Sequence, residues 1–284
     1  MKKPNPLSIL VLPFLLLGLL STFSYAQSES PQQIKKPRYI PRVGQPGKDV
    51  IWVPTPEKLV EKMLWAAQVT PQDLVIDLGS GDGRMVIAAA RMGARSRGVE
   101  YNSDMVELAR NNAEEAGVAD KVEFIHGDIF EYDFSDATVV TMFLLPSINV
   151  KLRPKLLQMK PGTRIVSNSF AMGDWRPDYK ATIQESDPTW KTALIWIVPA
   201  QIAGTWKMGE SDLVIRQEYQ KFFGTCRTPN KTTNIAEGSL YGDSVSFEIN
   251  GDKYTGHLTS EGTLEGVVAF GEESREWVAS RVFY

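Results

Sequence analysis

The sequence predicts a doubly wound α/β domain with a mainly parallel sheet, followed by a small antiparallel β-domain. Two patterns support this prediction. Between residues 49 and 199, short and almost wholly apolar segments alternate with amphipathic ones, as expected when helices cover both faces of a parallel sheet. Between residues 200 and 284, helical periodicity is absent, glycines recur at short intervals, and short segments alternate between apolar and polar residues.

The α/β part divides into elements along the chain. Thr55 and Pro56 have the residue types of a helix N-cap and first turn, and apolar residues follow at helical spacing. Ser103 is expected to cap a later helix that Gly117 ends. The expected helices are residues 55–67, 85–92, 103–116 and 147–159, the last with a kink at Pro154. The expected strands are residues 74–76, 96–100, 122–126, 138–144, 163–167 and 192–198.

The C-terminal part is expected to fold as strands joined by tight turns. An Asn-Gly pair at residues 250–251, a strong hairpin signal, lies between the alternating segments 244–249 and 254–258. Trp206 near the start and Arg281 near the end resemble the tryptophan–arginine packing pair of lipocalin-like barrels. The segment is short for a complete barrel of eight strands, so we expect a smaller β-domain.

The composition restricts the class of protein. The chain has 284 residues, of which 43% are hydrophobic and 23% are charged, which excludes a disordered or fibrous protein. With 31 basic and 34 acidic residues the formal net charge is -3, so no nucleic-acid partner is expected. The single cysteine, Cys226, excludes an internal disulfide, and no motif of metal ligands stands out, so we expect no metal.

The N-terminal segment has the three-part pattern of a secretory signal peptide. Two lysines after the first methionine are followed by an apolar stretch at residues 7–20 and by small residues at the two positions that define a cleavage site after Ala26. We therefore expect residues 1–26 to be a signal peptide and residues 27–48 to be an extended lead-in. The mature chain would be periplasmic or extracellular. The alternative is an uncleaved segment that anchors the chain to a membrane.

A glycine-rich loop follows the first expected strand. This strand is joined to the next helix by Asp77-Leu78-Gly79-Ser80-Gly81-Asp82-Gly83, a geometry in which glycines let a ligand approach the backbone and the helix N-terminus. The spacing G-x-G-x-G differs from the G-x-G-x-x-G of dinucleotide-binding enzymes. Asp77 would also repel a pyrophosphate, whereas S-adenosylmethionine carries an ammonium group, a sulfonium and no phosphate. A nicotinamide-dependent oxidoreductase is therefore disfavoured.

Two further acids follow the next two strands. Glu100 ends the strand at residues 96–100, where it is placed to accept hydrogen bonds from both hydroxyls of a ribose. Asp128 follows the strand at residues 122–126, where it is placed to accept one from an adenine amino group. Because the carboxyl ends of parallel strands meet at one edge of a sheet, we expect both acids and Asp77 to surround one ligand.

These residues resemble the class I S-adenosylmethionine-dependent methyltransferases. The resemblance covers roughly residues 50–199 and implies a seven-stranded Rossmann-like sheet with S-adenosylmethionine across its carboxyl ends. Carried over position by position, it implies that the cofactor is bound by Asp77, Gly79, Ser80, Gly81, Glu100, Asp128 and Ile129. The alternative is a doubly wound domain whose glycines only make tight turns, which leaves the three acids unexplained.

The residues after the fourth strand bear on the methyl acceptor. Amino-methylating enzymes of nucleic acids and glutamine have an Asn-Pro-Pro-Tyr type loop there, whereas this chain has Phe143-Leu144-Leu145-Pro146-Ser147, without the polar amide. This loop, the glycine loop and residues 53–56 resemble the membrane-anchored protein-lysine methyltransferases of mitochondrial carrier and ATP synthase subunits, which lack a comparable β-domain. The resemblance implies protein lysine as the leading hypothesis for the acceptor. A small-molecule acceptor stays open.

A candidate catalytic base lies just after the fifth strand. An amine must lose a proton before it attacks a methyl group, and Asp174 is a carboxylate on the side where the acceptor should enter. Trp175 and Trp190 are expected to line the acceptor pocket. The alternative is that Asp174 only stabilises a turn.

A second hypothesis concerns the whole chain. S-adenosylmethionine is made in the cytosol, whereas the N-terminal segment predicts export. The chain would then be an exported, non-catalytic binding module that retains the methyltransferase fold. The complete set of acids favours the enzyme, because unpaired buried charges are costly to keep.

Overall fold

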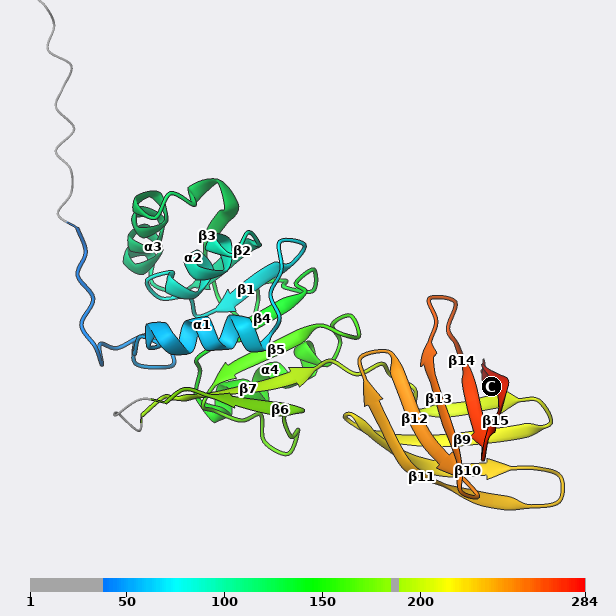
Figure 1. The fold of residues 1–284 in the computed structure, drawn as a ribbon. Coiled ribbons are helices and arrows are strands. Elements are labelled where there is room, and N and C mark those ends of the chain that lie inside the picture. Colours follow the sequence, from blue (N-terminus) through cyan, green and yellow to red (C-terminus); the bar gives the residue numbers. More distant parts are fainter. Residues whose placement is uncertain (1–37, 185–188, 284) are drawn as a thin grey trace, which may run out of the picture. The chain divides into compact units, whose positions relative to one another are not determined.

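The computed structural model describes residues 38–184 and 189–283, so the expected signal peptide lies outside the described residues. The α/β part contains a seven-stranded sheet with the strand order β3-β2-β1-β4-β5-β7-β6 (Figure 1). Strands β1 to β5 pair in parallel, while β7 is antiparallel to β5 and β6 to β7. The strands are β1 (Leu74–Leu78), β2 (Arg95–Glu100), β3 (Val122–His126), β4 (Val139–Met142), β5 (Arg164–Asn168), β6 (Tyr179–Thr182) and β7 (Thr192–Ile197). The predicted fold class is confirmed.

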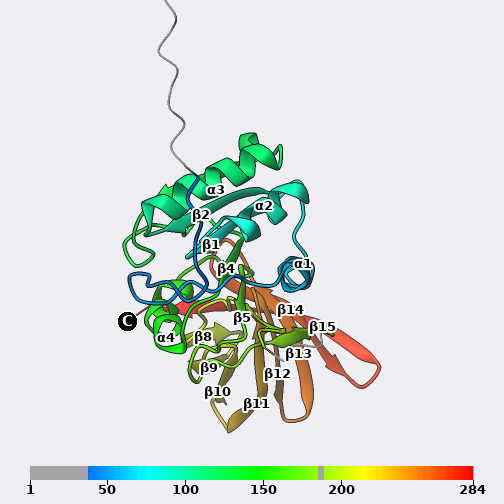
Figure 2. The same ribbon diagram turned by 90° about the vertical axis from the view of Figure 1, so that its left-hand side faces the viewer.

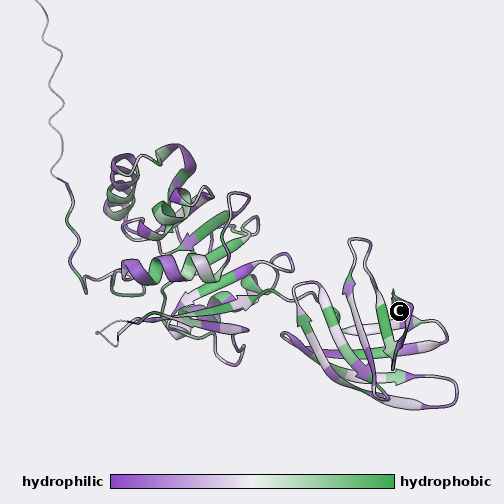
Figure 3. Cartoon of the chain, viewed as in Figure 1, coloured by the Kyte–Doolittle hydropathy of each residue, from purple (hydrophilic) through white to green (hydrophobic). Residues whose placement is uncertain are grey.

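Helices cover both faces of this sheet (Figure 2). Alternate residues of β1 point to opposite faces, since Val75 packs in one apolar cluster with α1 and α2, and Ile76 packs in another with α4. A third cluster joins α2 to α3. The helices are α1 (Glu57–Ala66), α2 (Arg84–Arg91), α3 (Ser103–Glu115) and α4 (Pro146–Leu156), with a short 3₁₀ turn at Ala119–Lys121. Figure 3 shows how the apolar residues concentrate in the strands between these layers.

Two predicted helix caps are wrong. Helix α3 is capped by Asn102 rather than Ser103, and the Asn102 side chain accepts hydrogen bonds from the backbone N–H groups of residues 104 and 105. Helix α1 begins after Pro56 with no side-chain cap. The Thr55 hydroxyl instead accepts a hydrogen bond from Asn168 at the end of β5, because the chain passes over that strand before the helix begins.

The sequence analysis missed strand β6. It has only four residues, which alternate between partly buried and exposed, and it pairs only with β7 at the edge of the sheet. Such a short segment has too little apolar periodicity to stand out from a loop.

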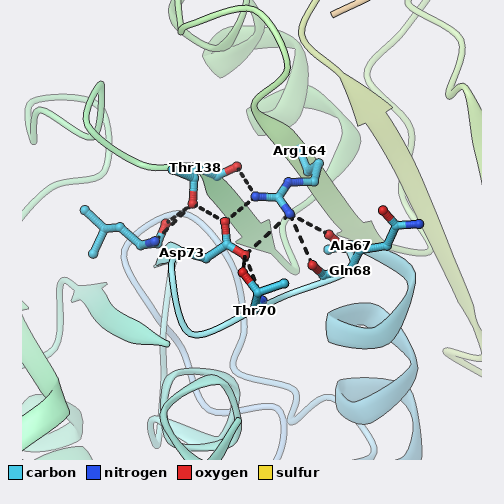
Figure 4. Close-up of polar contacts among 7 residues, drawn as sticks. Ala67, Gln68, Thr70, Asp73, Thr138 and Arg164 are labelled. Atoms are coloured by element: carbon cyan, nitrogen blue, oxygen red, sulfur yellow. Dashed lines mark hydrogen bonds and ion pairs between the residues drawn. The ribbon is translucent and has the colours of Figure 1, made fainter. Parts of the chain in front are cut away.

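A buried ion pair joins the elements at the amino edge of the sheet (Figure 4). Asp73, just before β1, pairs with Arg164 at the start of β5 and accepts hydrogen bonds from both Thr70 and Thr138. Arg164 also donates to the backbone carbonyl of Ala67 at the end of α1. These contacts lie at the edge opposite to the carboxyl ends of the parallel strands.

The C-terminal part forms a closed antiparallel barrel of eight strands, so the expectation of an incomplete barrel was wrong. The barrel closes because most strands are joined by turns of only two residues, such as 209–210 and 271–272, and because β15 pairs with β8. Arg281 lies 4.5 Å from the centre of the buried Trp206 ring, which confirms the predicted pair. The strands are β8 (Gly204–Met208), β9 (Ser211–Glu218), β10 (Lys221–Arg227), β11 (Thr232–Tyr241), β12 (Ser244–Ile249), β13 (Asp252–Leu258), β14 (Thr263–Phe270) and β15 (Glu273–Val282).

The interior of the barrel is filled by its own side chains. Phe247 is in ring contact with Phe222, Tyr254 and Trp277, and Cys226 is buried in the same apolar cluster. Across residues 38–184 and 189–283, no helix is both long and apolar enough to span a bilayer.

Candidate active site

A cavity of about 1060 Å³, including its open mouth, lies at the carboxyl ends of the parallel strands. The ends of β1, β2 and β4 and the residues just after β3 line it, and so do residues 45–55, a segment before α1 that we call the strap. All seven residues predicted to bind the cofactor are among its lining residues: Asp77, Gly79, Ser80, Gly81, Glu100, Asp128 and Ile129.

The glycine loop has the backbone conformation that its composition predicts. Gly79, Gly81 and Gly83 have φ of 81°, 54° and 83°, in the left-handed region that favours glycine. A Cβ atom on Gly81 would lie 2.7 Å from the indole nitrogen of Trp52 in the strap, so no side chain fits between the loop and the strap. The loop therefore brings its backbone directly against the cavity.

Asp77 is a buried carboxylate at the end of β1. Only 7% of its surface is exposed, and it accepts a hydrogen bond of 2.7 Å from the Thr141 hydroxyl on β4. Burial raises the pKa of Asp77 to about 7, the Thr141 hydrogen bond opposes this shift, and the charges of Glu100 and Asp82 add to it. A cationic ligand group would stabilise the ionised form of this carboxylate, as the ammonium of S-adenosylmethionine can.

Glu100 connects the glycine loop to the start of α3. Its two carboxylate oxygens accept hydrogen bonds of 2.9 Å from the backbone N–H groups of Gly81 and Asn102. Each oxygen keeps a second lone pair, so the carboxylate can also accept hydrogen bonds from a ribose.

Asp128 after β3 is paired with a residue of the strap. One of its oxygens accepts a hydrogen bond from the backbone N–H of Phe130, and the other is in contact with the Lys48 ammonium. The hydrogen bond that Lys48 donates lowers the pKa of Asp128, and the same bond raises the pKa of Lys48. Lys48 also lies 4.7 Å from the centre of the Tyr101 ring.

The strap was missed by the sequence analysis as part of the site. Lys48 ends the expected lead-in, residues 27–48, and Trp52 lies four residues further on, and neither was predicted to line the cavity as both do. Their contacts, with Asp128 and Gly81, join residues far apart in the sequence, and no local pattern predicts such pairs.

Aromatic rings gather beside the cavity on the β4 side. Phe143 follows β4 and lines the cavity, Phe170 lies just after β5, and Trp190 lies just before β7. The ring centres are 5.0 to 6.0 Å apart, and all three side chains are partly buried. Trp190 therefore lies close to its expected position, although Phe143 is the ring that lines the cavity.

Asp174 and Trp175 are not among the residues that line this cavity. The Asp174 carboxylate pairs with Arg153 of α4 and accepts a hydrogen bond from the Tyr219 hydroxyl. These two bonds lower the pKa of Asp174, the one from Tyr219 most. Trp175 is fully buried and packs against Trp196 and Tyr219, so the expectation that it lines the acceptor pocket was wrong.

The chemistry of this cavity fits S-adenosylmethionine. Three carboxylates end three neighbouring strands, which suits a ligand with a cationic amino acid end and a nucleoside, and the glycine loop leaves its backbone open to that ligand. The Ser80 hydroxyl, buried in the same loop, has no hydrogen-bond partner among the described residues. A phosphate-bearing ligand would meet the buried carboxylate of Asp77.

Comparison with known proteins also indicates an S-adenosylmethionine-dependent methyltransferase. Residues 77–179 match the family described as the ANTKMT methyltransferase domain. A protein-lysine N-methyltransferase of Saccharolobus islandicus is 44% identical over 141 residues, which are 49% of this chain and 88% of that protein. The adenine nucleotide translocase lysine N-methyltransferase of Mus musculus is 38% identical over 130 residues, 45% of this chain and 56% of the mouse protein.

One solved structure also matches this part of the chain. It is an RNA methyltransferase from Salinibacter ruber in complex with S-adenosyl-L-homocysteine, which is 53% identical and covers 53% of this chain and 96% of its own, with a TM-score of 0.49. Because the match covers 88% of the Saccharolobus enzyme at 44% identity, the chain belongs to the same family, the class I S-adenosylmethionine-dependent methyltransferases. Its cofactor is S-adenosylmethionine.

Proposed function

We propose that this methyltransferase acts on the Nζ atom of lysine side chains in proteins. The observation that carries the proposal is the apolar wall of the cavity after β4, formed by Met142, Phe143, Leu144 and Ile148. An enzyme that methylates the planar amine of a base or an amide needs a polar group there to hold it. A lysine side chain needs an apolar passage for its methylene stem.

The relatives support a protein-lysine acceptor. Both the Saccharolobus protein and the mouse translocase enzyme are named for lysine methylation. The formal net charge of -3 gives no support to a polyanionic nucleic-acid acceptor.

The side chains of this site act mainly by positioning. S-adenosylmethionine supplies a methyl group on a positively charged sulfur. The lysine ammonium first loses a proton, and the neutral amine then takes the methyl group by in-line displacement, which leaves S-adenosylhomocysteine and a methylammonium. Asp77, Glu100 and Asp128 orient the cofactor, which turns a collision of two molecules into a reaction within one complex. The apolar wall disfavours a charged ammonium and so increases the fraction of neutral lysine. The role of Asp174 as a base stays a prediction.

Methyl transfer to defined polymers tests this proposal. The purified protein is incubated with S-adenosylmethionine that carries a radioactive methyl group, together with poly-L-lysine, poly-L-arginine or total RNA. We expect label on poly-L-lysine alone. Label on RNA would overturn the proposal. Cofactor binding in calorimetry without transfer to any acceptor, including free amines, would instead favour the non-catalytic binding module.

We also propose that the protein works outside the cytosol. The basic residues, apolar stretch and small residues of positions 1–26 support this proposal. N-terminal sequencing of the protein recovered from a cell that produces it is expected to begin at Gln27, in the periplasmic or extracellular fraction. An intact N-terminus in the membrane fraction would support the anchored alternative, and an intact N-terminus in the cytosol would contradict both.

A further inference from the structure

The carboxyl edge of the sheet is divided between two kinds of residue. The acids at the ends of β1, β2 and β3 are Asp77, Glu100 and Asp128, and all three line the cofactor cavity. The next positions along the same edge belong to β4, β5 and β7, since the strand order continues β1-β4-β5-β7. Because β7 is antiparallel to β5, its first residue lies at the same edge as the last residues of the parallel strands.

Each of these three strands contributes one aromatic ring at this edge. Phe143 follows β4, Phe170 follows β5 after one intervening residue, and Trp190 precedes β7 by two positions. The three rings are in mutual contact, with centres 5.0 to 6.0 Å apart, and the shortest distance joins Phe143 and Trp190 although β4 and β7 are not neighbours in the sheet. The rings therefore form one cluster, which we call the aromatic wall, and Phe143 connects it to the cavity.

The backbone that carries Phe170 is held by buried polar groups. Asn149 of α4, which has no exposed surface, donates a hydrogen bond of 3.1 Å to the Phe170 carbonyl, and the Ser167 hydroxyl donates another of 2.7 Å. The next residue toward β5, Ser169, has a φ of 61° and donates its N–H to the Thr192 carbonyl of β7. These hydrogen bonds fix the backbone that carries the Phe170 ring.

We propose that Phe143, Phe170 and Trp190 form one wall of the channel through which the acceptor lysine reaches the cofactor. The inference rests on the proposed lysine acceptor and specifies its recognition. The three acids bind the amino acid, ribose and adenine parts of the cofactor on the β1–β3 side, so the acceptor approaches the methyl group from the β4 side. The faces of Phe170 and Trp190, outside the cofactor cavity, attract the entering ammonium by cation–π interaction, and they pack against the methylene stem once the amine has reached the cavity and lost its proton. An unbranched alkylamine fits such a wall and can lose a proton to become a nucleophile, whereas the guanidinium of arginine stays protonated.

Single substitutions in the aromatic wall separate recognition from folding. The variants are Phe170→Ala and Trp190→Ala, the conservative variant Trp190→Phe, and the control Trp65→Ala, which removes an exposed ring from α1. Methyl transfer to poly-L-lysine and S-adenosylhomocysteine affinity are measured for each. Phe170 and Trp190 are outside the lining of the cofactor cavity, so the affinity for S-adenosylhomocysteine should stay unchanged.

The two alanine variants are expected to lose about tenfold in kcat/KM, mainly through KM. Trp190→Phe should recover most of this loss, and Trp65→Ala should behave as the wild type. Unchanged kinetics in both alanine variants would overturn the inference. A parallel loss of S-adenosylhomocysteine affinity would also overturn it, because the rings would then support the fold of the cavity instead of contacting the acceptor.

A binding measurement tests the channel without requiring methyl transfer, so the channel and the proposed function can fail independently. If the wild type transfers no methyl group to poly-L-lysine, the proposed function fails. n-Butylamine, which has the length of a lysine side chain, is then titrated into the complex with S-adenosylhomocysteine, and tryptophan fluorescence is compared between the wild type and Trp190→Phe. A saturable signal that this variant lacks would support the channel, and its absence would overturn it.

Discussion

The Thr141 hydroxyl on β4 donates a hydrogen bond of 2.7 Å to the buried carboxylate of Asp77, directly opposite it on the neighbouring parallel strand β1. This bond favours the ionised carboxylate, but burial outweighs it and raises the pKa of Asp77 to about 7. In the cofactor-free protein a large fraction of Asp77 is therefore protonated near neutral pH. If Asp77 pairs with the cofactor ammonium as predicted, cofactor binding requires its ionised form.

The affinity for S-adenosylhomocysteine should therefore depend on pH. Below about pH 7 the proton on Asp77 competes with the ligand, so the affinity is expected to rise up to about tenfold per pH unit and to level off above pH 7. The same raised pKa makes the folded, cofactor-free protein bind a proton more tightly than the unfolded chain. Its free energy of unfolding should thus fall as the pH rises from about 4 to 7.

Calorimetric titrations at several pH values, with Asp77→Asn as the control, check this dependence. The variant lacks the titrating carboxylate, so it should bind about 1–3 kcal/mol more weakly at pH 8.5 and show a flatter pH profile. Parallel profiles of the wild type and the variant would mean that another group, including the ligand's own amine, causes the pH dependence.

Glu100 should matter for both the loop and the cofactor. Glu100→Gln replaces one acceptor oxygen by an NH₂ group, which must then face a backbone N–H of Gly81 or Asn102. We expect S-adenosylhomocysteine affinity to fall by about 1–3 kcal/mol. The matched control is Glu114→Gln on the exposed face of α3, which makes the same chemical change away from the cavity. Equal affinities of the two variants in calorimetry would contradict the assignment of Glu100.

The contact between loop and strap can be tested at Gly81. Gly81→Ala places a Cβ atom 2.7 Å from the Trp52 indole nitrogen and requires alanine at a φ of 54°, so either the strap or the loop must move. We expect cofactor affinity to fall more than tenfold. Gly117→Ala is the control, since its φ of 69° imposes a similar backbone cost while its Cβ meets no atom within 4 Å.

Both variants should lose about 1–2 kcal/mol of stability, because an alanine in the left-handed region has its Cβ too close to the following carbonyl oxygen. Only Gly81→Ala should lose cofactor binding, as measured by calorimetry. If Gly117→Ala loses as much affinity as Gly81→Ala, the effect is general destabilisation and the strap does not constrain the loop.

Local patterns in the sequence were sufficient to predict the acids of the site and most of the sheet. Asp77 and Glu100 lie at the ends of β1 and β2, Asp128 follows β3, and topology alone brings such strand ends together. The contact of Lys48 with Asp128 spans 80 positions and involves a segment without periodicity, so it could not be predicted. Trp175 was misplaced for a related reason, because it packs against Trp196 of β7 and Tyr219 of the β-barrel part, which lie 21 and 44 positions further along the chain.

The ion pair between Asp73 and Arg164 should contribute to stability far from the active site. Burial alone would raise the pKa of Asp73, but hydrogen bonds from Thr138, Arg164 and Thr70 together lower it. Arg164→Met leaves a nearly buried carboxylate without its cation and removes a donor to the end of α1. We expect a loss of about 2–4 kcal/mol at neutral pH, measured by urea unfolding.

The pH dependence of this loss distinguishes the ion pair from lost packing. A carboxylate with a lowered pKa stabilises the fold above its ordinary pKa of 3.8, and this contribution disappears as the pH falls through the lowered value. The difference between the wild type and Arg164→Met should therefore shrink below about pH 4. Lys207→Met, which breaks the exposed pair with Asp212 on the barrel, should cost less than about 1 kcal/mol at every pH. A loss in Arg164→Met that is equally large at pH 3 and pH 7 would mean that the arginine stabilises the sheet through its stem and its backbone contacts, and not through the charge of Asp73.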